Sequence, residues 1–287
     1  MPVESIRMTS FRNHTKTELT FGPGINVIWG ENGSGKTSVL EAIYILSTGK
    51  SFKTKRLPEI IKEDFETTRV SGIFSRKDQK KEIAIGQTKT GRRKITINSA
   101  PAQIRELLLE SQTVLLSPEE EEITKGAPSV RRQFFDRLFS TISKEYLTTL
   151  IDYTKTLKQR NALLKTKNPE KQIELWDDTL AQKAEKLWAL REFFLNNFST
   201  CLKTTSKDYS RGEILIRLIR EKTKLEKKEF ISALIESRKK DLITQTTNCG
   251  PHRDVYSFSI NEKKIKTFGS QGEHKIALVI IKLSEYL

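Results

Sequence analysis

Alternating hydrophobic and polar positions at the start of the chain predict two β-strands. Val3, Ile6 and Met8 fit the first strand, and residues 19–21 fit the second, with a polar turn between them. A short apolar run at 24–29 (GINVIW) follows a Gly-Pro-Gly break, and its β-branched residues predict a third, buried strand.

The residues after this run change to helical spacing. Residues 36–47 (KTSVLEAIYILS) place apolar side chains near one face and contain neither Pro nor Gly, which predicts a helix. A basic connector at 49–56 (GKSFKTKR) then leads to a possible short helix at 57–65, started by Pro58.

Three β-like runs follow, at 68–75, 82–87 and 94–98. Polar and basic connections separate them. Because short polar links join neighbouring antiparallel strands, these runs predict an antiparallel meander.

Residues 101–249 are mainly helical in pattern. A short helix at 103–109 and a short apolar strand at 113–116 are expected first, and acidic residues at 119–122 suit the first turn of a helix. The whole stretch predicts a separate, mainly helical lobe.

Two long amphipathic segments dominate this lobe, at 129–165 and 170–207. Asn168 and Pro169 break the pattern between them. Two long helices joined by a short break predict an antiparallel helical arm.

The last part of the chain mixes strands and helices. A strand is possible at 213–219, a basic helix at 227–242 and a strand at 255–260. The nearly continuous apolar stretch at 275–287 predicts a buried helix.

The apolar run at 24–29 and the helix after it enclose a phosphate-binding motif. The motif G-x-x-x-x-G-K-T comprises Gly30, Glu31, Asn32, Gly33, Ser34, Gly35, Lys36 and Thr37. In such a P-loop, backbone N–H groups and the N-terminus of the next helix bind phosphates. A glycine-rich turn with an incidental lysine is the alternative, but both flanking segments favour the P-loop.

The chemistry assigns a role to each kind of residue in this loop. The glycines permit positive φ and close approach to an anion. Lys36 reaches the terminal phosphates of ATP, the Thr37 hydroxyl can bind Mg²⁺, and Ser38 can add a second hydroxyl.

Charge narrows the choice of partner. The 287 residues include 51 Lys and Arg against 36 Asp and Glu, a formal net charge of +15. Such a balance favours a polyanion, with nucleic acid ahead of an anionic membrane surface, although solvated lysine-rich faces would give the same count. No long apolar stretch or apolar leader is present, so we expect a soluble, cytoplasmic protein. Cys201 and Cys249 lie in no metal-binding or disulfide pattern.

A second candidate motif lies directly before the last helix. Ser270, Gln271 and Gly272 stand at its start, where backbone N–H groups attract anions. In ABC-type ATPases, a signature of this kind caps the ATP held by the P-loop of the other subunit. A serine that only caps its helix is the alternative.

Taken together, the motifs resemble the RecF family, bacterial DNA-gap repair proteins that are ABC-type ATPases related to SMC heads. Two strands before the P-loop also resemble an ABC-type head rather than a small-molecule kinase. The matching segments are Phe11-Arg12-Asn13, the P-loop at 30–37, Ser117-Pro118-Glu119, residues 126–136 with Arg131-Arg132, Gly250-Pro251-His252-Arg253-Asp254, and Ser270-Gln271-Gly272.

The resemblance implies an α/β fold: an ABC-type P-loop NTPase head with an inserted helical arm subdomain. Residues 1–100 and 250–287 would form a discontinuous ATP-binding lobe, and 101–249 the helical lobe. Arg12 and Asn13 would flank the nucleotide, and the signature Ser270, Gln271 and Gly272 would meet ATP across a homodimer.

The resemblance also implies a function in DNA repair, replication and recombination and in the SOS response. ATP and Mg²⁺ would be the cofactors. The protein would form an ATP-dependent homodimer, bind double-stranded and gapped DNA, and act with RecO and RecR to load RecA.

The sequence departs from the family pattern at several points. Glu273 replaces a usual Gln, Val255 a usual acid, and Gln112 precedes rather than follows the strand at 113–116. The chain ends at Leu287, before the Walker B acids of the family, so catalytic residues are unknown and we expect a fragment or truncated product with negligible ATP hydrolysis.

Three other interpretations remain open at this point: an ATP-dependent nuclease with an ABC-like head, an inactive ATP-binding fragment, and a small-molecule P-loop kinase. The nuclease would need an acidic metal-binding domain after the ATPase. The candidate DNA contacts are Lys53, Lys55, Arg56, Arg92, Arg93, Lys94, Lys155, Lys158, Arg160, Lys165 and Lys167.

Overall fold

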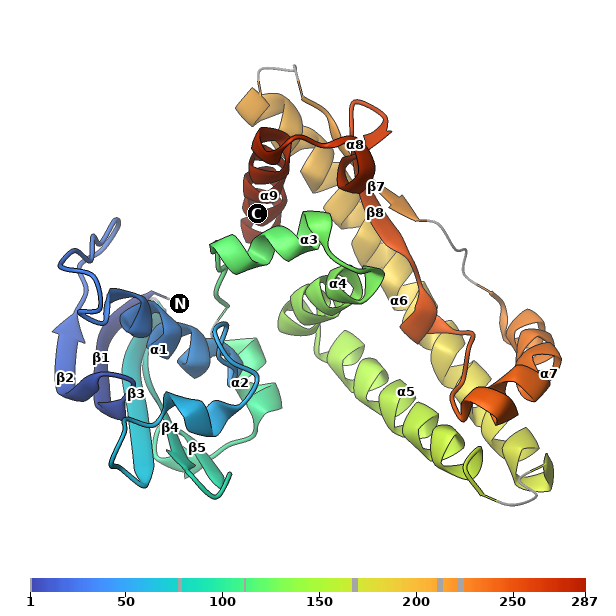
Figure 1. The fold of residues 1–287 in the computed structure, drawn as a ribbon, viewed down its shortest axis with the longest axis horizontal. Helices are drawn as coiled ribbons and strands as arrows, with labels where there is room; N and C mark the ends of the chain where they lie inside the picture. The colour runs from blue at the N-terminus through green and yellow to red at the C-terminus, as the bar shows by residue number, and fades with distance from the viewer. Residues whose placement is uncertain (1, 77–78, 111, 167–169, 211–213, 221–224) are drawn as a thin grey trace. The chain divides into compact units, whose positions relative to one another are not determined.

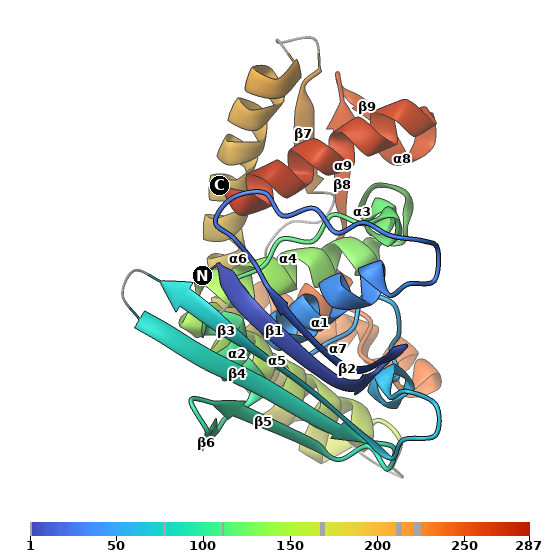
Figure 2. The same cartoon turned by 90° about the vertical axis from the view of Figure 1, so that its left-hand side faces the viewer.

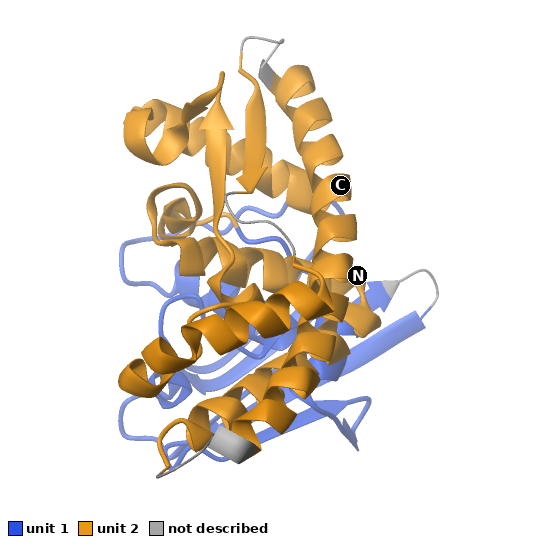
Figure 3. Ribbon diagram, turned by 90° about the vertical axis from the view of Figure 1, so that its right-hand side faces the viewer, with its two compact units in different colours: residues 1–115 blue, residues 116–287 orange. Residues whose placement is uncertain are grey.

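The computed structural model describes residues 2–76, 79–110, 112–166, 170–210, 214–220 and 225–287 (Figure 1). The chain divides into two compact units, residues 1–115 and 116–287 (Figure 3). Each unit has its own hydrophobic core.

The first unit is built on one antiparallel sheet. Its strands lie in the order β2-β1-β3-β4-β5-β6 (Figure 2). They are β1 (Val3–Phe11), β2 (His14–Thr20), β3 (Thr67–Arg76), β4 (Gln79–Thr88), β5 (Arg93–Ile97) and β6 (Ala100–Pro101). The predicted opening pair of strands and the meander are confirmed.

Helices cover one face of this sheet. They are α1 (Lys36–Thr48), a 3₁₀ turn η1 (Leu57–Ile60) and α2 (Ile104–Glu110). Buried strand residues such as Met8 and Val70 share a core with Ile45 of α1, because alternate residues of each strand point to the same face. The helices predicted at 36–47, 57–65 and 103–109 are therefore present, the middle one as a single short turn.

The strand predicted at 24–29 is wrong. No described strand pairs with these residues, and Ile25 and Trp29 are 95% and 87% exposed. The Asn26 side chain holds the segment in a local loop, since it accepts from Gly22 N and donates to Gly22 O, both at 2.9 Å. A strand depends on a hydrogen-bonded neighbour as well as on β-branched residues, and only the residues were visible in the sequence.

The strand predicted at 113–116 is also wrong. These residues form no strand, and Leu116 is exposed. The segment spans the boundary between the two compact units, which explains an apolar run without a sheet around it.

The second unit is mainly helical. Its helical elements are η2 (Pro118–Glu121), α3 (Glu122–Lys125), α4 (Pro128–Ile142), α5 (Lys144–Leu163), α6 (Glu170–Ser210), α7 (Lys227–Thr244), η3 (Pro251–Arg253), α8 (Ile265–Phe268) and α9 (Gln271–Tyr286). Helices α5 and α6 pack side by side as the predicted arm. The break predicted at 168–169 lies outside the described residues.

The structure has two helices where the sequence predicted one. The helix predicted at 129–165 ends at Ile142 and starts again at Lys144. Ser143 adopts an extended backbone and its hydroxyl accepts from Tyr146 N at 3.1 Å, so it caps α5. An N-cap serine interrupts a helix even where the hydrophobic spacing continues across it.

A small antiparallel sheet completes this unit, in the order β7-β8-β9. Its strands are β7 (Ile216–Arg220), β8 (Tyr256–Ile260) and β9 (Lys263–Lys264). Residues 250–287 pack with the helices of 116–249 in this unit. The sequence grouped them instead with residues 1–100, and that discontinuous ATP-binding lobe stays a prediction.

Candidate nucleotide-binding site

The P-loop runs directly into α1. Gly35, with φ of 97°, is the residue before Lys36, the first residue of the helix. A side chain at Gly35 would collide with His14 and lie 2.8 Å from Asn13 Oδ1, so both the conformation and the close packing require glycine. No side chain caps α1, which leaves its first N–H groups available for an anion.

The side chain of Lys36 folds back onto the P-loop. Its Nζ donates to the carbonyl oxygens of Gly30 and Glu31 at 2.8 and 2.6 Å. The ammonium group therefore already lies at the curve of the loop, where it can bind a phosphate held by the backbone.

The turn between β1 and β2 supports the loop from the other side. Asn13 Nδ2 donates to Gly33 O at 2.8 Å. His14 Nε2 donates to Gly35 O at 3.3 Å while its Nδ1 accepts from Thr17 Oγ1 at 3.0 Å. The structure thus brings Asn13 to the loop, as the sequence predicted, and adds His14, which lies directly after the turn that joins β1 and β2.

Arg12 lies at the same turn but points to a different partner. Its Nε and Nη2 donate to the Glu41 carboxylate at 2.9 and 2.7 Å, and its Nη1 donates to Glu59 O at 2.9 Å. Glu41 is fully buried and also accepts from Ser51 Oγ, at the start of the basic connector. Sequence reasoning missed Glu41, although an acid one turn after Thr37 on the P-loop helix was a possible signal.

A cleft of about 620 Å³ lies over these elements. Arg12, Lys36, Lys53 and Lys62 supply positive charge to its wall, and among the described residues Glu63 is the one acid that lines it. The full set of lining residues is Arg12, Asn13, Asn32, Gly33, Gly35, Lys36, Thr37, Ser38, Lys53, Lys62 and Glu63. Gly30, Glu31 and Ser34 belong to the loop without lining the cleft.

The Thr37 hydroxyl suits a metal ligand. Thr37 lines the cleft, and no described residue forms a hydrogen bond with its hydroxyl. Magnesium at nucleotide sites takes most of its oxygen ligands from phosphates and water, so one protein hydroxyl is compatible with it. Among the described residues no group of three or more His, Cys, Asp or Glu could hold a metal ion alone.

The signature lies in the second unit, at the start of α9. Ser270 Oγ accepts from Glu273 N at 3.3 Å, and the Glu273 carboxylate accepts from Ser270 N at 2.7 Å. The hydrogen bond that Ser270 N donates to the Glu273 carboxylate lowers the pKa of Glu273. The serine is thus a helix cap in this structure, while Ser270, Gln271 and Gly272 are all exposed.

The segment 250–254 forms part of the polar interior of the second unit. Asp254 is buried and accepts from Trp188 Nε1 at 3.1 Å and from Arg191 Nη1 at 2.8 Å. His252 Nε2 donates to Thr247 O at 2.9 Å, and burial lowers the pKa of His252 to about 4. These contacts give the motif a structural role within the described residues.

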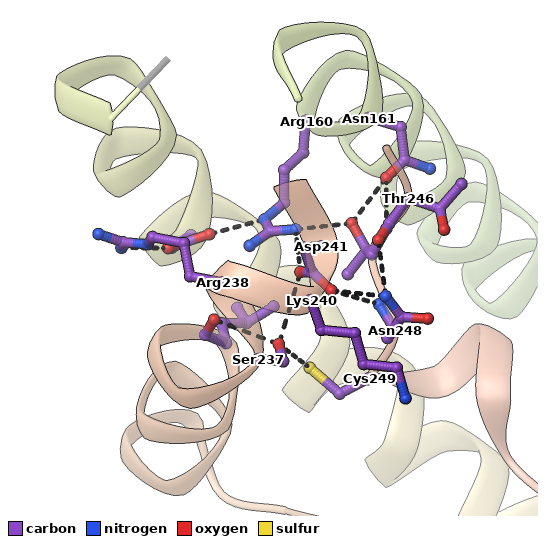
Figure 4. A network of polar contacts seen from close by, with 12 residues as sticks. Arg160, Asn161, Ser237, Arg238, Lys240, Asp241, Thr246, Asn248 and Cys249 are labelled. Carbon is purple, nitrogen blue, oxygen red and sulfur yellow. Dashed lines mark hydrogen bonds and ion pairs between the residues drawn. The ribbon is translucent and has the colours of Figure 1, made fainter. Parts of the chain in front are cut away.

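One predicted DNA contact is wrong. Arg160 of α5 is fully buried: its Nε donates to Asp177 of α6 at 2.7 Å and its Nη1 to Asp241 of α7 at 2.8 Å (Figure 4). A guanidinium paired with two buried carboxylates holds three helices together and cannot reach a ligand in solvent.

The other arm candidates, Lys155, Lys158 and Lys165, are exposed, and Lys167 lies outside the described residues. In the first unit, Lys53 lines the cleft at the P-loop, and Arg93 Nη1 donates to Gly49 O at 2.9 Å.

Comparison with known proteins decides the family. A family model described as the RecF/RecN/SMC N terminal domain matches residues 2–283. The chain is 33% identical over 299 residues to the DNA replication and repair protein RecF of Clostridioides difficile, covering 99% of this chain and 80% of that protein. The RecF protein of Lachnoclostridium phytofermentans is also 33% identical, over 290 residues, with the same coverage. The chain belongs to the RecF family.

Solved structures agree with this assignment. A structure of the recombination mediator protein RecF with ATP in the RecFOR pathway superposes with a TM-score of 0.91 and 31% identity, covering 99% of this chain and 79% of that one. An Smc head domain from Pyrococcus furiosus, 15% identical with a TM-score of 0.54, shares the fold. The predicted ABC-type head related to SMC heads is confirmed. No helix within the described residues is long and apolar enough to cross a membrane.

Proposed function

We propose that this RecF-family chain binds ATP with Mg²⁺ in the cleft at the P-loop. The observation that carries the proposal is the placement of Lys36 over the curve of an uncapped P-loop, in a cleft lined by three further cations. The cleft wall has four positively charged side chains and one acidic one among the described residues, and this excess of positive charge matches the negative charge of a triphosphate. Thr37 supplies a free hydroxyl for the metal, and Asn13 and Arg12 border the site.

ATP binding would regulate DNA binding. Two copies would close on ATP, with the exposed Ser270, Gln271 and Gly272 of one copy meeting the nucleotide of the other, and the dimer would then bind double-stranded and gapped DNA. A solved relative named as a recombination mediator of the RecFOR pathway supports RecO and RecR as partners, with RecA loading as the outcome. These partners would place the activity in the cytoplasm.

Titration calorimetry with ATP and Mg²⁺ tests the nucleotide site. Lys36→Ala should weaken binding by roughly 10- to 100-fold, because a charge-assisted contact contributes about 1.5–3 kcal/mol. Lys165→Ala is the matched control, since Lys165 is exposed and lies on the helical arm. Unchanged ATP affinity in Lys36→Ala would disprove the site. Gel filtration and duplex binding with and without ATP then test dimerisation and DNA binding.

A further inference from the structure

Within the first unit, one face of the sheet is covered by none of the unit's described helices. Alternate strand residues on the covered face, such as Met8, Val70 and Ile85, are buried in the core with α1. The residues between them point the other way, and Arg7 and Arg69 among them are exposed. Exposed polar side chains therefore lie on this open face, on strands whose order is β2-β1-β3-β4-β5 (Figure 2).

Strand pairing brings three distant cations into one row on this face. Lys16 pairs with Thr9, and Thr9 also pairs with Arg69. Arg69 pairs with Gly86, and Gly86 pairs with Lys94. Directly paired residues point to the same face, so the row reads Lys16, Thr9, Arg69, Gly86, Lys94, with its cations about 10 Å apart at two strand spacings each.

The charges of this row are uncompensated. Lys16, Arg69 and Lys94 are exposed, and none of them has an ion-pair partner among the described residues. In the next row Arg7 pairs with Glu18 at 2.9 Å, so that row is neutral. Charge complementarity therefore favours an extended anion along the Lys16–Arg69–Lys94 row.

Gly86 gives an independent indication of a ligand. It lies between Arg69 and Lys94 in the interior of a strand, where glycine weakens pairing. Its φ is not in the left-handed region, and an added Cβ would meet nothing closer than Thr68 O, at 3.9 Å. Neither backbone conformation nor packing requires glycine here. A strand glycine of this kind often marks a place where a ligand or another backbone approaches the sheet closely.

We infer that the row Lys16–Arg69–Lys94 binds the phosphate backbone of duplex DNA, with Gly86 leaving room for a phosphate between Arg69 and Lys94. The choice of DNA as the polyanion rests on the proposed function. Contacts of this kind carry no sequence preference and release counterions, so affinity depends strongly on salt.

Fluorescence anisotropy with two labelled duplexes of unrelated sequence, at several salt concentrations and with ATP, tests the inference. Replacing Lys16, Arg69 and Lys94 together by Ala should weaken binding to both duplexes equally and reduce the slope of log K against log salt by about 3. The control replaces Lys203, Lys207 and Lys239, exposed residues of α6 and α7, by Ala and removes the same charge. An equal effect in the control would show that net charge alone acts, and would overturn the inference.

The Gly86→Thr variant distinguishes an effect on duplex binding from an effect on folding. Threonine suits a strand, so the midpoint of thermal unfolding should stay the same or rise, while duplex binding weakens because the gap is filled. Wild-type binding in both the triple variant and Gly86→Thr would overturn the inference and leave the proposed function intact. A wild-type chain that binds no duplex with or without ATP would instead refute the proposed DNA binding. Heparin is a second polyanion with which binding to the row can be measured. If the variants lose heparin binding but keep duplex binding, DNA is not the ligand of this row.

Discussion

Glu41 accepts two hydrogen bonds from the guanidinium of Arg12, at 2.9 and 2.7 Å, across 29 positions of sequence. Glu41 lies on the P-loop helix one turn beyond Thr37, and its side chain is fully buried. Arg12 has a φ of 53°, a conformation that costs energy for a residue other than glycine. The buried carboxylate thus holds a strained arginine at the wall of the cleft at the P-loop.

Glu41→Gln should destabilise the first unit by about 1.5–3 kcal/mol, because it removes a charge-assisted contact and leaves Arg12 without its anion. Urea unfolding measures the loss. In a double-mutant cycle the loss should be smaller when Arg12 is already Ala, since the two groups act on each other. Additive effects of the two substitutions would show that Glu41 acts independently of Arg12.

Thr37→Val should keep the shape of the site and remove the hydroxyl that we assign to Mg²⁺. We expect the gain in ATP affinity given by Mg²⁺ to fall by about tenfold, or ~1.4 kcal/mol. Calorimetric titration with and without the metal measures this gain. Thr37→Ser, which keeps a hydroxyl, should behave like the wild type. If valine leaves the gain unchanged, Thr37 is not the ligand.

His252 should make folding sensitive to acid. Its Nδ1 accepts from Tyr153 at 2.5 Å and its Nε2 donates to Thr247, and burial lowers its pKa from 6.5 to about 4. Between these values the unfolded chain takes up a proton that the folded chain does not, so stability falls as pH decreases from about 6.5 to about 4. The shift corresponds to on the order of 3 kcal/mol.

The pH dependence of urea unfolding checks this expectation. His252→Gln, which keeps a donor for Thr247 O but does not titrate, should lose this part of the dependence even if it is less stable at every pH. Parallel curves for the two proteins would assign the acid sensitivity to other groups.

Arg160→Met should cost about 3–5 kcal/mol of stability, because it removes the ion-pair partner of the buried Asp241 and leaves Asp177 with Arg238 alone. Lys158→Met, on the same helix and exposed, should change stability by less than about 0.5 kcal/mol. Urea unfolding of the second unit compares the two variants. A small loss for Arg160→Met would mean that the buried pair is replaceable by an apolar side chain.

Local patterns in the sequence predicted much of this protein. The P-loop motif, the helix at 36–47 and the meander all depend on residues within a few positions of each other, so neighbouring residue types carry the information. The same holds for the resemblance to the RecF family, which the comparisons confirm over residues 2–283.

Tertiary structure decided what depends on distant partners. The apolar run at 24–29 has strand-like composition but no described strand with which to pair. Arg160 was predicted to be a surface cation, but in the structure it is buried between helices from three parts of the chain. Lys16, Arg69 and Lys94 form one row only through strand register. The sequence by itself determined the P-loop motif and the family of the chain, because that motif is local. Burial, ion pairing and the geometry of the open sheet face depend on residues that are distant in the sequence. They could therefore be determined only from the tertiary structure.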